Sequence, residues 1–140
     1  ALPKCRVFAF DTDGSMLLAP SILPVIGTRQ PKNLYILVFD NEQLFGSRGG
    51  PSRQTATGTN IAGIAKASGI ESVRMLRDRS LLRSEIDAFL VSEGPSMLVA
   101  KIQPLGRGAG PRMDGQENKY KFVRHVERVA QIEILGAPKP

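Results

Sequence analysis

The side chains that could do chemistry in this chain of 140 residues gather in two short groups, DTDGS at 11–15 and DN at 40–41. Each group directly follows an apolar run, RVFAF at 6–10 and LYILVF at 34–39, and such runs are typical of buried strands. In a parallel sheet, ligands bind at the carboxyl ends of the strands. Because carboxylate oxygens can hold a hard cation there, the sequence predicts a cation or phosphate site at this edge.

The first group has a second feature that suits a phosphate. Gly14 lets the backbone approach a phosphate closely, and a helix that begins after Ser15 would add its free amide groups to the same place. The plainer alternative is a strand-to-helix turn in which the Asp and Ser side chains serve only as caps.

Strand and helix patterns alternate along the rest of the chain. We expect helices at 15–28 (bent or interrupted by Pro20 and Pro24), 59–69, 81–91 and 117–129, further strands at 72–76 and 97–102, and loops at 42–58 and 104–113. This alternation predicts an α/β fold, a parallel sheet flanked by helices. The organisation we predict is one α/β domain over 1–104 and a C-terminal arm and helix over 105–140.

Composition narrows the class of protein. The chain is 41% apolar and 23% charged, as in globular proteins, and no apolar run approaches the roughly 20 residues that cross a bilayer. The single cysteine forms no internal disulfide, which favours the cytoplasm. The net charge is +6, but the basic residues are scattered and Trp is absent, so we expect no nucleic-acid partner. The chain enters its first strand without a preceding Met, which suggests a fragment, a processed chain or part of a larger protein.

The sequence DTDGS after an apolar strand resembles that of the haloacid-dehalogenase phosphatases, which carry Asp-x-Asp-Gly-Thr at this place. Asp11, Asp13 and Ser15 fit that pattern, with Asp11 as the nucleophile by resemblance. The family also needs a Ser or Thr at the end of a second strand, a Lys and a later acidic pair. Here DN stands at 40–41, and the chain has no adjacent acidic pair.

The thiamine-diphosphate-dependent enzymes are a fuller match. They carry Gly-Asp-Gly-Ser after one strand and Asn-Asn or Asp-Asn at the end of the next. This chain has TDGS at 12–15 and DN at 40–41, with 28 positions from Asp13 to Asn41. Three further segments resemble the sulfopyruvate and phosphonopyruvate decarboxylase branch of this family. They are PKNL at 31–34, GSRGG at 46–50 and TNIAGIAKASG at 59–69. The whole resemblance covers about residues 6–104.

This resemblance implies the diphosphate-binding domain of the thiamine-diphosphate-binding fold, without its first strand and helix. It implies that Mg²⁺ is bound by the side chains of Asp13 and Asn41 and by the main-chain carbonyl of Gln43, in the oxygen environment that Mg²⁺ prefers. The residues implied to bind the cofactor are Thr12, Asp13, Gly14, Ser15, Asn41, Gln43 and Leu44. Asp40 is expected to cap its turn.

The activity implied by the resemblance is non-oxidative decarboxylation of a 2-oxo acid. In this family a glutamate from a partner pyrimidine-binding domain or subunit activates the cofactor, and nothing in this chain matches that domain, so we expect an oligomer. A third alternative stays open. Thr12 replaces the first glycine of the family motif and Ala19 replaces an Asn in the following helix, which would also suit a non-catalytic relative that serves as an interaction subunit.

Overall fold

The computed structural model describes residues 2, 4–43, 53–103 and 114–136. The chain divides into two compact units, one over Arg6–Arg107 and the other formed by Ala1–Cys5 with Gly108–Pro140. The predicted boundary at residue 104 and the arm over 104–113 lie outside the described residues.

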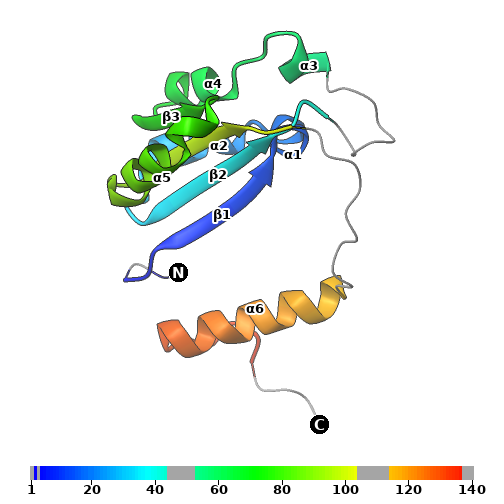
Figure 1. Ribbon diagram of the computed structural model, residues 1–140. Coiled ribbons are helices and arrows are strands. Elements are labelled where there is room, and N and C mark those ends of the chain that lie inside the picture. The colour runs from blue at the N-terminus through cyan, green and yellow to red at the C-terminus, as the bar shows by residue number, and fades with distance from the viewer. Residues whose placement is uncertain (1, 3, 44–52, 104–113, 137–140) are drawn as a thin grey trace. The chain divides into compact units, whose positions relative to one another are not determined.

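The first unit is built on a four-stranded sheet of order β1-β2-β4-β3 (Figure 1). The strands are β1 (Val7–Thr12), β2 (Leu34–Asp40), β3 (Ser72–Leu76) and β4 (Ser96–Lys101). All three pairings are parallel, with Thr12 opposite Phe39 and Asp40 opposite Lys101. The predicted α/β fold is confirmed, and the carboxyl ends of the strands meet at one edge.

The helices of this unit follow the predicted alternation. They are α1 (Asp13–Leu18), α2 (Ile22–Arg29), α3 (Arg53–Ala56), α4 (Ile61–Ala67) and α5 (Leu82–Val91), with a 3₁₀ turn η2 (Arg79–Leu81) before α5. The chain leaves the helical conformation around Pro20, as expected. Pro24 does not break α2, because it lies in the first turn, where a backbone N–H has no acceptor within the helix.

Two expectations about these elements were wrong. The first helix begins at Asp13 and not after Ser15, because the side chain of Thr12 caps it by accepting from the Ser15 amide. The segment 42–58 is not loop throughout, since α3 forms at its end.

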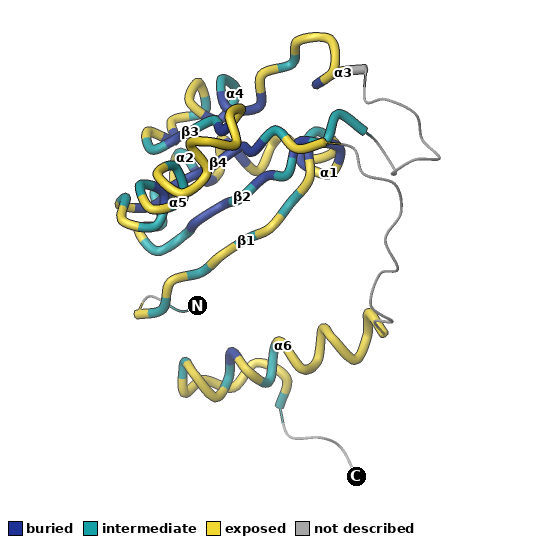
Figure 2. Tube along the Cα trace, viewed as in Figure 1, coloured by how far each residue is buried: buried dark blue, intermediate teal, exposed yellow. Residues whose placement is uncertain are grey.

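Helices cover both faces of the sheet, as side chains that alternate along each strand require (Figures 1 and 2). On one face α1, α2 and α4 pack on inward-pointing residues such as Ile36, Val38 and Val99. On the other face Phe89 of α5 packs against Leu98. The first face is the larger core, and α1 and α4, which both follow strand ends at the carboxyl edge, pack against it.

The second unit is described for helix α6 (Gly115–Ala130) and the residues that follow it. Asp114 caps the helix by accepting from the amides of Gln116 and Glu117, which starts it two residues before the predicted Glu117. None of the described helices has the length and apolar character needed to cross a membrane.

Candidate metal site at the carboxyl edge of the sheet

Asp13 is the most deeply buried charged residue at this edge, with 0% of its surface exposed. It is the first residue of α1, directly after β1. Its Oδ2 accepts a hydrogen bond of 2.8 Å from the Thr55 hydroxyl. Its Oδ1 is buried and has no hydrogen-bond partner among the described residues. Buried carboxylate oxygens almost always have a hydrogen-bond partner or a bound cation. The unpaired Oδ1 is therefore available to a positively charged ligand.

The turn that ends β2 is held by two side chains. The Asp40 carboxylate accepts from the amide of Glu42 at 3.2 Å, and the side-chain oxygen of Asn41 accepts from the amide of Gln43 at 3.0 Å. Glu42 takes a φ of 59°, the left-handed region that a non-glycine residue seldom adopts. Asp40 therefore caps the turn as predicted, and the two hydrogen bonds hold the chain in an uncommon conformation that fixes Asn41.

Lys101, the last residue of β4, forms ion pairs with the acidic side chains of the β2 turn. Its amine lies 2.8 Å from Asp40 Oδ2 and 2.7 Å from Glu42 Oε1, and 3.5 Å from the carbonyl oxygen of Thr55. Burial of the amine lowers the pKa of Lys101, but the hydrogen bonds and negative charges of Asp40 and Glu42 outweigh it, so the pKa is raised. Lys101 is thus a fixed cation that neutralises Asp40.

Thr12 occupies the position where the related motif has a glycine. Its backbone is extended, with φ −120° and ψ 162°, which any residue adopts without strain. Its side chain accepts from the amide of Ser15 at 3.4 Å, and its own amide donates to Asp11 Oδ1 at 2.8 Å. The threonine therefore fits this turn, and the Asp11 carboxylate is engaged locally.

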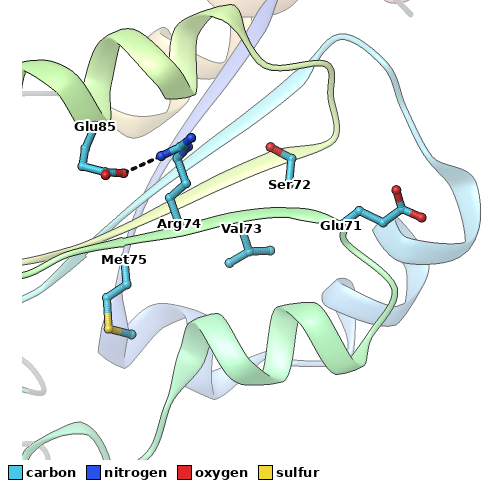
Figure 3. A pocket seen from close by; sticks show the side chains of 6 residues that line it. All are labelled: Glu71, Ser72, Val73, Arg74, Met75 and Glu85. Atoms are coloured by element: carbon cyan, nitrogen blue, oxygen red, sulfur yellow. Dashed lines mark hydrogen bonds and ion pairs between the residues drawn. The ribbon is translucent and has the colours of Figure 1, made fainter.

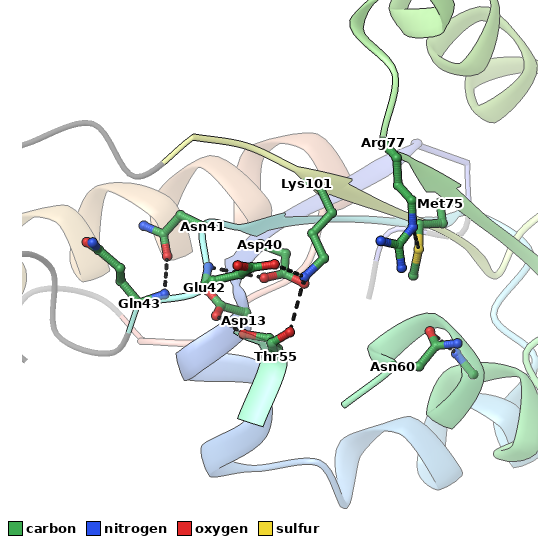
Figure 4. Close-up of polar contacts among 11 residues, drawn as sticks. Asp13, Asp40, Asn41, Glu42, Gln43, Thr55, Asn60, Met75, Arg77 and Lys101 are labelled. Atoms are coloured by element: carbon green, nitrogen blue, oxygen red, sulfur yellow. Dashed lines mark hydrogen bonds and ion pairs between the residues drawn. The ribbon is translucent and has the colours of Figure 1, made fainter. Parts of the chain in front are cut away.

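The structure gathers most of the predicted site residues at one edge. Figure 4 shows Asp13, Asn41 and Gln43 close to Asp40, Glu42, Thr55 and Lys101. Gly14 is buried and Ser15 exposed in the first turn of α1. Leu44 and the glycine-rich segment 46–50 lie outside the described residues.

Sequence reasoning missed Thr55 and Lys101. No local signal marks Thr55, which lies in a stretch of polar residues. Lys101 carried a usable signal, since it lies one residue before the end of the predicted strand 97–102; the structure places it in register with Asp40.

The donor set fits a hard cation. In the described ranges, no three His, Cys, Asp or Glu side chains are grouped to hold a metal ion. The oxygens that remain are the free Oδ1 of Asp13, the amide oxygen of Asn41 and main-chain carbonyls such as that of Gln43. Hard ions such as Mg²⁺ select such oxygens, commonly with one or two carboxylates and with substrate phosphates.

A hollow of about 450 Å³ along the outer strand β3 is separate from this edge (Figure 3). Arg74 and Glu85, which line it, form an ion pair of 2.8 Å. Their charges are therefore matched, and the hollow shares no residue with the group around Asp13.

The fold and the edge group define an α/β domain with carboxylate and amide oxygens at the carboxyl ends of its parallel strands. The chain is 33% identical over 125 residues to the sulfopyruvate decarboxylase β subunit of Methanococcus maripaludis, and 29% identical over 124 residues to that of Methanocaldococcus jannaschii. It is 30% identical over 125 residues to the phosphonopyruvate decarboxylase of Streptomyces viridochromogenes. These matches cover 88%, 88% and 86% of the chain.

Over most of its length the chain is thus similar to sulfopyruvate and phosphonopyruvate decarboxylases, which supports the branch of the thiamine-diphosphate-dependent enzymes that its motifs resemble. It spans 65% of the length of the two β subunits and 30% of the phosphonopyruvate decarboxylase. No protein-family model matches the chain.

Proposed function

We propose that this chain binds thiamine diphosphate through Mg²⁺ and forms the diphosphate-binding part of an enzyme that decarboxylates a 2-oxo acid. The observation that carries the proposal is the buried Oδ1 of Asp13, which lacks a hydrogen-bond partner among the described residues. The names of the relatives support the reaction class.

Three oxygens of the chain would hold the metal ion. They are Asp13 Oδ1, the side-chain oxygen of Asn41 and the main-chain carbonyl of Gln43. The Asn41 oxygen already accepts from the amide of Gln43, but an amide oxygen has a second lone pair for a cation. Mg²⁺ takes six oxygens in near-octahedral geometry, so the diphosphate and water would supply the others.

The remaining residues at the edge would bind the diphosphate and shape its site. Ser15 is exposed in the first turn of α1, so its hydroxyl can donate to a phosphate oxygen. Asp40 would not bind the metal, because its carboxylate is paired with Lys101. Among the described residues of this edge, Asp13 would thus offer the metal ion a buried carboxylate oxygen that accepts no hydrogen bond.

When bound, thiamine diphosphate supplies the thiazolium group that accepts the electron pair released as CO₂ leaves. The task of this chain would be to bind and orient the cofactor. A pyrimidine-binding domain or subunit would supply the activating glutamate, and two of the relatives are β subunits, which supports such a partner. Their names favour a 2-oxo acid with a second anionic group. An oligomeric state and a cytoplasmic location stay predictions.

The alternative of a non-catalytic relative rested partly on Thr12. The unstrained backbone and capping role of this residue speak against that argument. Nothing in the geometry around Asp11 favours the phosphatase alternative, since its carboxylate accepts from the next amide.

The direct test is calorimetric titration of thiamine diphosphate, in the presence of Mg²⁺, into the chain combined with its pyrimidine-binding partner. We expect saturable binding that needs the metal ion and weakens at least about tenfold in Asp13→Asn, a nearly isosteric change that removes the charged ligand. Asp87→Asn changes an exposed carboxylate on α5 and should bind as the unaltered chain does. Absence of binding, or equal binding by Asp13→Asn, would overturn the proposal.

A further inference from the structure

We infer that Thr55 is a positioning residue for the metal ligand: its hydroxyl holds the Asp13 carboxylate so that Oδ1 faces the metal ion. This inference rests on the proposed function. Thr55 lies on α3, 42 positions after Asp13 in the sequence.

The geometry defines which carboxylate oxygen is left for the metal. The Thr55 hydroxyl has a single proton, and at 2.8 Å it is placed to donate this proton to Asp13 Oδ2. Both residues are buried, at 5% and 0% exposure, so water does not compete freely for this hydrogen bond. Oδ2 is therefore engaged by a hydrogen bond, whereas Oδ1 has no partner among the described residues and is the more available oxygen.

A carboxylate fixed in this way is a better ligand than a free one. Groups that hydrogen-bond to metal ligands fix their orientation, and loss of such a group typically weakens metal binding about 10- to 100-fold. Here the hydrogen bond also favours ligation through one oxygen, since the other is engaged. The arrangement suits Mg²⁺, which demands a regular geometry.

The main chain of Thr55 is also in contact with Lys101. The Lys101 amine lies 3.5 Å from the main-chain carbonyl of Thr55 and forms ion pairs with Asp40 and Glu42 (Figure 4). The chain of contacts runs from the end of β1 through α3 to the ends of β4 and β2. The short helix α3 is thus fixed to the two strand ends that would provide side-chain ligands.

The test uses Mn²⁺ as a paramagnetic substitute for Mg²⁺, with inorganic pyrophosphate as the probe for the diphosphate. Binding is followed by equilibrium dialysis, as the Mn²⁺ retained with the whole 140-residue chain at equal pyrophosphate concentration on both sides of the membrane. Thr55→Val keeps the shape of the side chain but removes the donor, and we expect at least about a tenfold loss of affinity. Thr55→Ser restores the hydroxyl and should bind within about threefold of the unaltered chain.

Two controls separate positioning from general stability. Thr28→Val makes the same change at an exposed site on α2 and should leave Mn²⁺ affinity unchanged. Val73→Ala truncates a buried side chain on β3, and should lower the melting temperature without weakening Mn²⁺ binding. A loss of affinity in Val73→Ala as large as in Thr55→Val would overturn the inference.

The outcomes also distinguish the inference from the proposed function. If the unaltered chain binds Mn²⁺ with pyrophosphate, Asp13→Asn does not, and Thr55→Val binds normally, then the positioning role of Thr55 is wrong and the metal site stands. If the unaltered chain shows no saturable binding, the metal site is wrong and the inference fails with it.

Discussion

Asp40 and Lys101 end adjacent parallel strands in register, and their side chains form an ion pair of 2.8 Å. The Asp40 side chain is 2% exposed and that of Lys101 is 18% exposed. A buried carboxylate is tolerated when it is paired and hydrogen-bonded, and Asp40 also accepts from the amide of Glu42. The pair therefore joins the ends of β2 and β4 beside Asn41.

Replacing Lys101 should destabilise the first unit strongly. Lys101→Met keeps the length of the side chain but leaves Asp40 buried without its cation, and removal of one partner of a buried pair costs about 3 kcal/mol. Urea unfolding followed by circular dichroism measures the loss. Lys66→Met on α4, where Lys66 is exposed, is the matched control and should change the free energy of unfolding by less than about 0.5 kcal/mol. A loss no larger than that of the control would contradict the role assigned to this pair.

The contact between α2 and α4 should not tolerate a side chain at Gly27. A Cβ atom there would lie 1.7 Å from the main-chain oxygen of Ser68, so Gly27→Ala forces the helices apart. We expect a destabilisation of about 3 kcal/mol, at the upper end of overpacking, measured by urea unfolding. Gly115→Ala places its Cβ in open space at the start of α6 and should be neutral or slightly stabilising. Equal effects of the two changes would show that the helices can separate cheaply.

The C-terminal end of α6 should loosen in acid. The carboxylate of Glu127 accepts from the amides of Leu135 and Ile134, at 2.7 Å each, and pairs with Arg124. These contacts lower the pKa of Glu127 below its ordinary value of 4.5. The folded state thus favours the ionised form, so the stabilisation is fully present above about pH 4.5 and is lost as the pH falls through the lowered pKa.

Hydrogen exchange of the Ile134 and Leu135 amides, followed by NMR between pH 3 and pH 6, measures this effect after correction for the intrinsic exchange rate. Protection should fall toward the acid end in the unaltered chain. Glu127→Gln removes the titrating group, so its protection should be low and independent of pH. A pH dependence that persists in Glu127→Gln would assign the effect to another residue.

The strands could be predicted because their signal is local. The run LYILVF at 34–39 and the sequence 72–76 identify β2 and β3 almost to the residue. The spatial order β1-β2-β4-β3 could not be read in the same way, because it depends on pairing between segments far apart in the sequence.

The grouping of side chains at the carboxyl edge was predictable to a similar degree. Asp13 and Asn41 could be placed there because each follows a recognisable strand. Thr55 was not, because its hydrogen bond to Asp13 exists only after α3 has folded back over the carboxyl edge. The start of α1 was misplaced for a related reason, since the capping bond of Thr12 is a property of the folded turn.

Thr12→Gly restores the residue that the family motif carries and tests whether the threonine alters cofactor binding. The backbone of Thr12 is extended, so glycine relieves no strain and removes only a capping acceptor, whose hydrogen bond is long at 3.4 Å. Glycine is itself an acceptable cap and costs only a few tenths of a kcal/mol relative to threonine. We therefore expect calorimetric affinity for thiamine diphosphate with Mg²⁺ to stay within about threefold of the unaltered chain, with Thr28→Gly as the control for glycine in an exposed helix. A gain of tenfold or more would show that the threonine side chain obstructs the diphosphate, and that this edge is built for weaker binding than the family motif provides.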